Sequence, residues 1–204
     1  MKLHLGCGAR ILEGWVNVDY ALGAKLAKAP LFRFINRKVK IFDMDWDRRI
    51  YLHDLRKQFP WPDGSVEMAY SSHTLEHLTR EEGLFFLKEC HRVLAPGGIM
   101  RIVVPDLACI VADYQSGKLR ADQFVESLGV LYATPHRGWK KKLAPFIEFP
   151  HRCMYDAPAL TAICLEIGFE CAPRKPFDSR IPDIQAVELE ERTKDAVIVE
   201  GVRK

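Results

Sequence analysis

The chain has 204 residues, of which 48% are hydrophobic and 28% are charged, and its formal net charge is +3. This length and composition are typical of one globular core, so we expect a single domain over residues 1–204. The sequence shows neither a membrane-spanning stretch nor a signal peptide, which favours a cytoplasmic protein. The small net charge gives no reason to expect a nucleic acid partner.

The six cysteines are scattered and form no Cys-x-x-Cys pair. This spacing suits reduced thiols that are buried as small apolar side chains, and it argues against a disulfide framework or a zinc site. We therefore predict no metal site from the sequence.

Apolar runs and turn residues predict alternating strands and helices. The predicted strands are residues 2–5, 15–18, 50–53, 66–71, 99–104, 169–172 and 196–202. Helices are predicted in part of 24–42, at 80–94, after Pro105-Asp106, and at 122–132 and 157–167. Residues 95–98 are expected to end one helix, and residues 190–195 to form a polar turn. The alternation indicates a doubly wound, Rossmann-like α/β fold with a mostly parallel sheet, whose ligands bind at the carboxyl ends of the strands.

A glycine turn follows the first predicted strand, and an acidic residue follows the second. Gly6 and Gly8 allow the backbone to turn sharply and to approach a ligand closely. Asp19 comes eleven residues after Gly8, where its carboxylate can accept hydrogen bonds from ribose hydroxyls. A dinucleotide fingerprint places this acid about twenty residues on, which argues against an NAD site. A tight turn with a capping aspartate is the structural alternative.

The third predicted strand ends at Asp54-Leu55, which offers a carboxylate and an apolar side chain beside the glycine turn. These groups suit the edge and the face of an adenine ring, so three successive strand ends are suitable for a nucleoside. A loop or helix-capping role is the alternative for Asp54 alone.

A histidine-rich turn, His73-Thr74-Leu75-Glu76-His77, follows the fourth predicted strand. Formally it is an inverted zinc-protease pattern, with Glu148 available as a third ligand. That site requires a continuous helix, whereas this segment directly follows a strand. The second hypothesis is that His77, or else His73, takes a proton from a substrate in the same site. The third is that these polar residues only hold a loop in place.

Together these residues resemble the class I S-adenosylmethionine-dependent methyltransferases, particularly the small type-11 branch. The similarity lies in residues 3–8 (Leu-His-Leu-Gly-Cys-Gly), 14–19 (Gly-Trp-Val-Asn-Val-Asp), 54–55 (Asp-Leu), 75–77 (Leu-Glu-His) and 92–98 (Arg-Val-Leu-Ala-Pro-Gly-Gly). In two respects the chain departs from the family: Arg10 replaces a third loop glycine, and the first helix is nearly absent.

The resemblance implies S-adenosylmethionine as cofactor and a seven-stranded sheet whose last strand, 196–202, is reversed. It assigns the amino acid part of the donor to Gly6 and Gly8, the ribose to Asp19, and the adenine to Asp54 with Leu55. The complete set of expected cofactor-binding residues is Gly6, Cys7, Gly8, Asp19, Tyr20, Asp54, Leu55, Ser71 and Ser72.

Two basic insertions, about 21–49 and 117–152, are the expected acceptor-binding segments. Their charge suits an anionic small molecule, saccharide or glycolipid, and similar proteins are often associated with polysaccharide or glycan assembly. Apolar residues interleaved with the basic ones also permit peripheral membrane contact through 24–42. A solvated basic surface is the alternative for both segments. The rival functions are an NAD(P)-dependent oxidoreductase and a non-catalytic S-adenosylmethionine-binding protein, and the oligomeric state is open.

Overall fold

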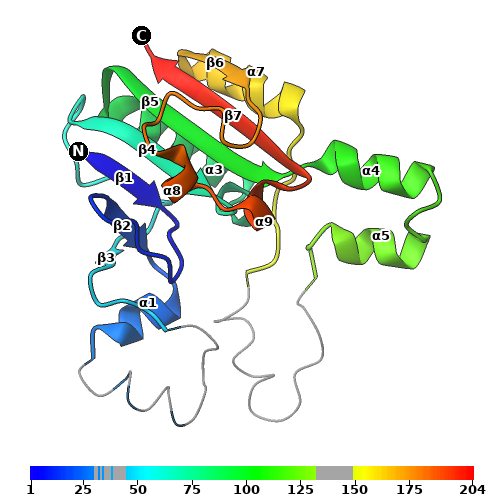
Figure 1. Cartoon of the computed structure of the whole chain (residues 1–204), viewed down its shortest axis with the longest axis horizontal. Coiled ribbons are helices and arrows are strands. Elements are labelled where there is room, and N and C mark those ends of the chain that lie inside the picture. Colours follow the sequence, from blue (N-terminus) through cyan, green and yellow to red (C-terminus); the bar gives the residue numbers. More distant parts are fainter. Residues whose placement is uncertain (30–31, 33, 35–37, 39–44, 132–148) are drawn as a thin grey trace.

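The computed structural model describes residues 1–29, 32, 34, 38, 45–131 and 149–204. A seven-stranded sheet with the order β3-β2-β1-β4-β5-β7-β6 forms its centre (Figure 1). The strands are β1 (Lys2–Leu5), β2 (Val16–Asp19), β3 (Tyr51–Leu52), β4 (Val66–Ser72), β5 (Leu94–Pro105), β6 (Phe169–Pro173) and β7 (Ala196–Arg203). β7 is antiparallel to both β5 and β6, whereas the paired strands from β1 to β5 are parallel. This confirms the predicted α/β fold with a reversed last strand.

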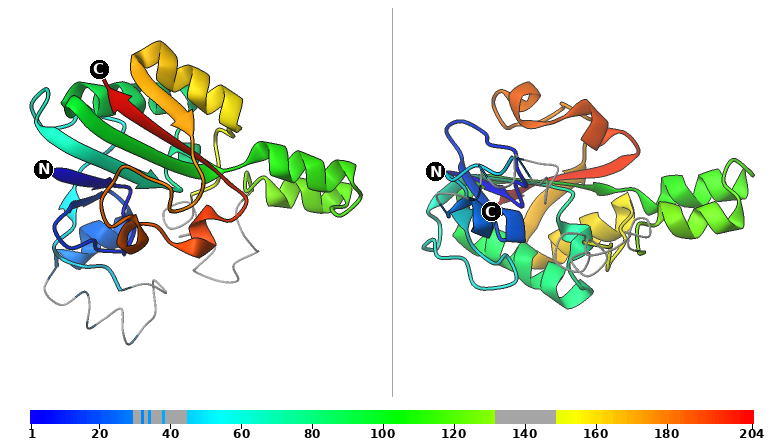
Figure 2. Two further views of the ribbon diagram at one scale, coloured as in Figure 1. Left: turned by 45° about the horizontal axis from the view of Figure 1, so that its top comes forward. Right: turned by 90° about the horizontal axis from the view of Figure 1, so that it is seen from below.

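Short and long helices connect these strands. They are α1 (Leu22–Ala27), the 3₁₀ helix η1 (Leu75–His77), α3 (Arg80–Val93), α4 (Leu107–Gln115), α5 (Ala121–Ser127), α7 (Ala157–Ile167), α8 (Ile184–Val187) and α9 (Glu190–Thr193). Figure 2 shows α3 and α7 on one side of the sheet and α8 and α9 on the other, while α4 and α5 project as a pair from the end of β5. Among the described residues, no helix is long and apolar enough to cross a membrane.

Local sequence explains where the two long helices begin and end. The Thr79 side chain accepts a hydrogen bond from the Glu82 N–H, and the Glu82 side chain accepts one from the Thr79 N–H, so α3 begins with a capping box. The Asp156 side chain caps α7, and Gly168 ends it with φ at 112°, a left-handed conformation that favours glycine. Because α3 and α7 both pack on β5, β6 or β7, these caps position the helices that cover one face of the sheet.

The main hydrophobic core lies between the sheet and the α3–α7 side. Its buried members include Leu5, Phe86, Met100 and Leu160, which come from two strands and two helices. A second core on the opposite face joins Tyr70 and Val103 to residues of α8 and of the adjoining loop. The sheet is therefore buried on both faces, as expected for a mostly parallel sheet.

A buried ionic cluster ties the C-terminal segment to the sheet. The Arg101 guanidinium, which is fully buried, donates to Glu188 at 2.8 Å and to Glu200 at 3.0 Å. Such a cluster stabilises the fold only while all of its partners are present, because a buried charge without a partner is costly. It holds Glu188, between α8 and α9, against the sheet strands β5 and β7.

The structure differs from the sequence prediction in several segments. The strand expected at 50–53 has only two residues, and residues 95–98 continue into β5 with a shift in register against β4. α5 begins and ends earlier than the predicted helix at 122–132, and α9 replaces the polar turn expected at 190–195. These segments are short or glycine-rich, so tertiary contacts decide their conformation.

Candidate active site

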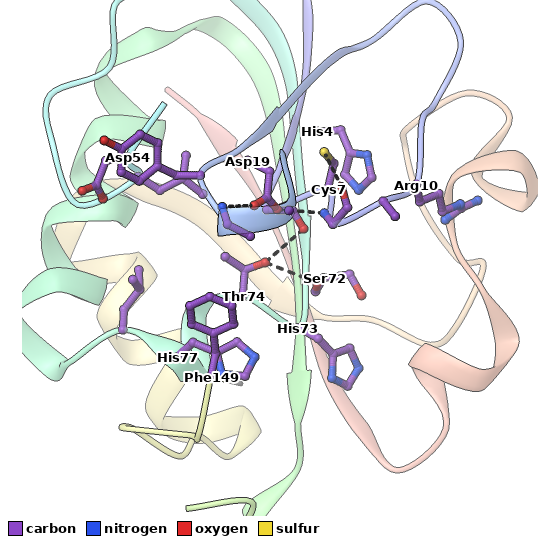
Figure 3. A pocket seen from close by; sticks show the side chains of 18 of the residues that line it. His4, Cys7, Arg10, Asp19, Asp54, Ser72, His73, Thr74, His77 and Phe149 are labelled. Carbon is purple, nitrogen blue, oxygen red and sulfur yellow. Dashed lines mark hydrogen bonds between the residues drawn. The ribbon is translucent and has the colours of Figure 1, made fainter. Parts of the chain in front are cut away.

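A cleft of about 1090 Å³ opens at the carboxyl ends of β1, β2 and β4. Ten of the eleven residues predicted as catalytic or cofactor-binding line it: Gly6, Cys7, Gly8, Asp19, Tyr20, Asp54, Leu55, Ser72, His73 and His77. Figure 3 labels Cys7, Asp19, Asp54, Ser72, His73 and His77 among them. Small-molecule sites generally measure about 300 to 1,000 Å³, so this cleft has room for a nucleoside and a second small molecule.

The glycine loop between β1 and β2 forms the floor of the cleft. Gly6 and Gly8 have φ angles of 71° and 56°, in the left-handed region. The N–H groups of Gly6 and Cys7 donate to the Val18 carbonyl at 2.9 and 3.0 Å, which fixes the loop to β2. A Cβ at Gly6 would lie 2.0 Å from the Thr74 side chain, whereas a Cβ at Gly8 would meet no described atom within 4 Å. Gly6 is therefore packed, and Gly8 faces open space.

Asp19, at the end of β2, is bonded to the loop. Its Oδ2 accepts from the Gly8 N–H at 2.8 Å and its Oδ1 from the Ala21 N–H at 2.7 Å. The neighbouring Tyr20 is 41% exposed. Burial raises the pKa of the Cys7 thiol, and the Asp19 carboxylate raises it further, so this thiol is neutral at physiological pH. Asp19 keeps lone pairs that could accept hydrogen bonds from a ligand.

Asp54 follows β3 and forms a two-point ion pair with Arg56. The Arg56 Nε and a terminal guanidinium nitrogen each donate to one Asp54 oxygen at 2.8 Å. This pairing lowers the pKa of the Asp54 carboxyl, which is ionised at neutral pH. Arg56 was not predicted from the sequence as a partner of Asp54. Leu55 is buried beside it and also lines the cleft.

Ser71 is the exception among the predicted cofactor residues. Successive residues of a strand face opposite sides of the sheet, and in β4 Tyr70 and Ser72 line the cleft while Ser71 does not. The Ser71 side chain is instead buried, with no hydrogen-bond partner among the described residues. The parity of β4 thus directs the Ser71 side chain away from the cleft, and its role as a cofactor residue stays a prediction.

His73 and His77 lie at the opposite end of the cleft from Asp54 (Figure 3). The His73 Nε2 is 2.8 Å from the Arg192 carbonyl, and the His77 Nδ1 is 3.5 Å from the Pro150 carbonyl. Burial lowers the pKa of His77. The side chain of Glu76, only 1% exposed, lies with its Oε1 3.3 Å from the His73 Nδ1.

The local backbone argues against the inverted zinc-protease pattern. His73 has φ at 52°, and only the three residues of η1 are helical before Leu78 adopts an extended conformation. The two histidines are therefore not presented by one continuous helix. The third ligand of that pattern, Glu148, lies outside the described residues.

Several residues of the cleft were not predicted from the sequence. Arg10, noted only as a departure from the family pattern, donates to the carbonyls of Ala186 and Val187 and so ties the glycine loop to α8. Arg192 comes from α9, and Arg152 from a segment before α7. Arg152 belongs to the second basic insertion, whereas no sequence motif marks Arg192, which folding alone brings to the cleft.

Only parts of the two basic insertions can be placed. Lys25 and Arg152 line the cleft, one from each insertion. Arg33, Arg37 and Lys40 lie outside the described residues, as does the basic group at 136–142. Most of the predicted membrane-contacting segment, 24–42, is also outside them.

The methyltransferase domain family matches residues 3–102, which contain the glycine loop, Asp19, Asp54 and both cleft histidines. A comparison with curated proteins gives no match. Among solved structures, the YcgJ protein of Bacillus subtilis shares 13% identity over 99% of this chain and 91% of its own, with a TM-score of 0.54.

A SAM-dependent methyltransferase from Methanosarcina mazei shares 15% identity over 98% of this chain and 89% of its own, with a TM-score of 0.54. Another from Archaeoglobus fulgidus shares 13% identity over 98% and 85%, with a TM-score of 0.51. At these identities the likeness concerns the fold. Residues 3–102 thus match a methyltransferase domain, the strand order is that of the class I methyltransferase fold, and together they identify an enzyme that uses S-adenosylmethionine.

Proposed function

We propose that the chain transfers the methyl group of S-adenosylmethionine, by in-line displacement, to an anionic small-molecule or saccharide acceptor. The observation that supports this best is the convergence of Gly6, Asp19, Asp54 and His77 on one cleft. Because the sulfonium donor is already activated, aligning donor and acceptor accounts for most of the catalysis, and alignment contributes roughly 7 to 11 kcal/mol in well-oriented systems.

In this proposal the donor occupies the half of the cleft that the glycine loop forms. The open space at Gly8 receives the amino acid part of the donor, and the free lone pairs of Asp19 accept from the ribose hydroxyls. The ionised Asp54 accepts from the adenine amino group while Leu55 packs on the ring. The remaining residues that line this half of the cleft and that we propose to contact the donor are Cys7, Tyr20 and Ser72.

The acceptor occupies the other half, beside His73 and His77. Besides Arg56 and Arg10, which is bonded to the carbonyls of Ala186 and Val187, three basic side chains line the cleft: Lys25, Arg152 and Arg192. The Arg192 guanidinium has no acidic partner within the part of the chain that the structure describes, and its side chain is exposed. An acidic or phosphorylated saccharide would supply that partner. For a hydroxyl acceptor, His77 and then His73 are the candidates to take the proton.

A calorimetric titration of the full chain with S-adenosylhomocysteine tests the donor site, with NADPH as the competing ligand. Asp54→Asn should weaken binding roughly ten- to hundredfold, since a hydrogen bond to a charged group contributes about 1.5–3 kcal/mol. Asp63→Asn is the matched control, because Asp63 pairs with an arginine at 2.6 Å but lies outside the cleft. Absence of binding, tighter binding of NADPH, or equal affinities for both variants would refute the assignment.

Two rival functions make different predictions in the same experiment. An NAD(P)-dependent oxidoreductase would bind the nicotinamide cofactor, whereas a non-catalytic protein would bind S-adenosylhomocysteine and transfer no methyl group to any acceptor. The family match supports the enzyme. The cytoplasmic location and the membrane contact through 24–42 stay predictions.

A further inference from the structure

Glu76, His77 and His151 form a cluster beside the acceptor half of the cleft. Glu76 and His77 belong to η1, and His151 comes from the segment before α7. The Glu76 carbonyl accepts from the N–H groups of Arg152 at 2.7 Å and of Cys153 at 3.1 Å. The main chain itself thus holds these two distant segments together.

The side chains of this cluster converge. One possible ligand atom from each of Glu76, His77 and His151 lies within 4.8 Å of the other two. The Glu76 side chain is 1% exposed, and neither of its oxygens has a hydrogen-bond partner among the described residues. A buried carboxylate in this position is unfavourable unless a proton or a cation compensates it.

The hydrogen bonds of the neighbouring imidazoles bear on whether a proton or a cation compensates the charge of Glu76. The Nδ1 atoms of His151 and His77 lie 2.8 and 3.5 Å from backbone carbonyls, and the His73 Nε2 lies 2.8 Å from a third. A carbonyl only accepts, so each of these nitrogens carries a ring hydrogen, and in the neutral ring the other nitrogen presents a lone pair.

Two of these lone pairs face the Glu76 carboxylate. The His73 Nδ1 is 3.3 Å and the His77 Nε2 4.0 Å from the Glu76 Oε1. The lone pairs of neutral imidazoles repel a carboxylate that they face, and either a proton on the ring or a cation between the groups removes this repulsion. Histidine ligands of metals almost always donate their second ring N–H to a carbonyl or a carboxylate, as these three do.

We propose that Glu76, His77 and His151 bind a divalent transition-metal ion, with His73 adjacent as a fourth ligand. Imidazole and carboxylate ligands suit Zn²⁺, Mn²⁺, Fe²⁺ and Co²⁺ better than Mg²⁺, which prefers oxygen ligands. Bonds of about 2.0–2.2 Å would draw the ligand atoms closer together on binding. This site differs from the zinc-protease pattern, which uses Glu148 and lacks His151.

The role of the ion rests on the proposed function. Because His77 lines the cleft, an open coordination position would face the acceptor. A hydroxyl bound there would lose its proton to water. The oxygen of the deprotonated acceptor would then donate an electron pair to the methyl carbon. The S–CH₃ bond breaks at the same time, and the electrons of that bond return to sulfur. His77 would be a ligand in this reaction rather than the proton acceptor.

Metal binding by the full chain, without S-adenosylmethionine, tests the site. Chelator-treated protein is titrated with Co²⁺ while its visible absorption is recorded, and Zn²⁺ content is measured after dialysis. We expect one ion per chain. Glu76→Gln and His151→Asn should each weaken binding at least tenfold. His91→Asn is the matched control, because His91 packs on Phe169 with ring centroids 4.9 Å apart, outside the cluster.

Circular dichroism shows whether each variant is folded. If Glu76→Gln does not fold, the test uses His151→Asn alone. The ion should also raise the melting temperature of the wild type and of His91→Asn, but not of His151→Asn. Failure to bind stoichiometric Co²⁺ or Zn²⁺, or equal affinities in His151→Asn and His91→Asn, would overturn the proposal. Binding of S-adenosylhomocysteine is measured separately, so either proposal can fail alone.

Discussion

Replacing Gly6 and Gly8 separately by alanine distinguishes packing from backbone strain in the cofactor loop. Both residues have positive φ, so each alanine has a backbone cost of about 1–2 kcal/mol. At Gly6 the new Cβ would also lie 2.0, 2.5 and 2.7 Å from the Oγ1, Cγ2 and Cβ of Thr74. Rotation of the Thr74 side chain cannot relieve this overlap, because its Cβ is itself too close.

Overpacking generally costs about 1–3 kcal/mol, so Gly6→Ala should lower the free energy of unfolding by about 2–5 kcal/mol. Gly8→Ala should lower it by only about 1–2 kcal/mol, because its Cβ meets no described atom within 4 Å. Urea denaturation with linear extrapolation measures both values.

The double variant Gly6→Ala/Thr74→Gly completes the experiment. Because Thr74 supplies all three close contacts, its removal should lessen the cost of the Gly6→Ala change. The two substitutions should therefore be coupled by about 1–3 kcal/mol in a double-mutant cycle. Equal destabilisation by the two single alanine variants, or additive effects in the double variant, would refute the packing explanation.

Two further predictions concern the pH dependence of stability and the acceptor. Burial lowers the pKa of His4 from 6.5 to about 4, so the unfolded chain binds more protons and stability falls as the pH falls through this range. Between pH 7 and 5 the wild type should lose about 2 kcal/mol more than His4→Phe in urea denaturation; parallel losses would contradict this. Arg192→Gln should raise KM for an anionic acceptor several-fold with kcat unchanged. Arg120→Gln should leave KM unchanged, because Arg120 is the N-cap residue of α5, pairs with Asp122 and does not line the cleft. A radiolabelled methyl-transfer assay measures both variants, and a higher KM of Arg192→Gln for neutral acceptors as well would argue against recognition of charge.

The sequence by itself determined the order of the strands and of the longer helices, and the residues at the ends of the first strands. The sequence predicts that three strand ends, with Gly6, Asp19 and Asp54, lie at one edge of the sheet. Each of these residues follows an apolar run, and parallel strands bring their carboxyl ends to the same edge. The caps of α3 and α7 are likewise local, since Thr79 and Glu82 lie within one helical turn.

Only the tertiary structure decided which side chains meet. The burial of Ser71 depends on the parity of β4, and the Arg56 partner of Asp54 depends on the conformation of a loop. His151 reaches Glu76 because main-chain hydrogen bonds join segments that are far apart in the sequence. Local patterns specify secondary structure, because its hydrogen bonds join near neighbours along the chain. The convergence of distant side chains depends on tertiary packing, and the periodicity of apolar residues along the sequence does not predict it.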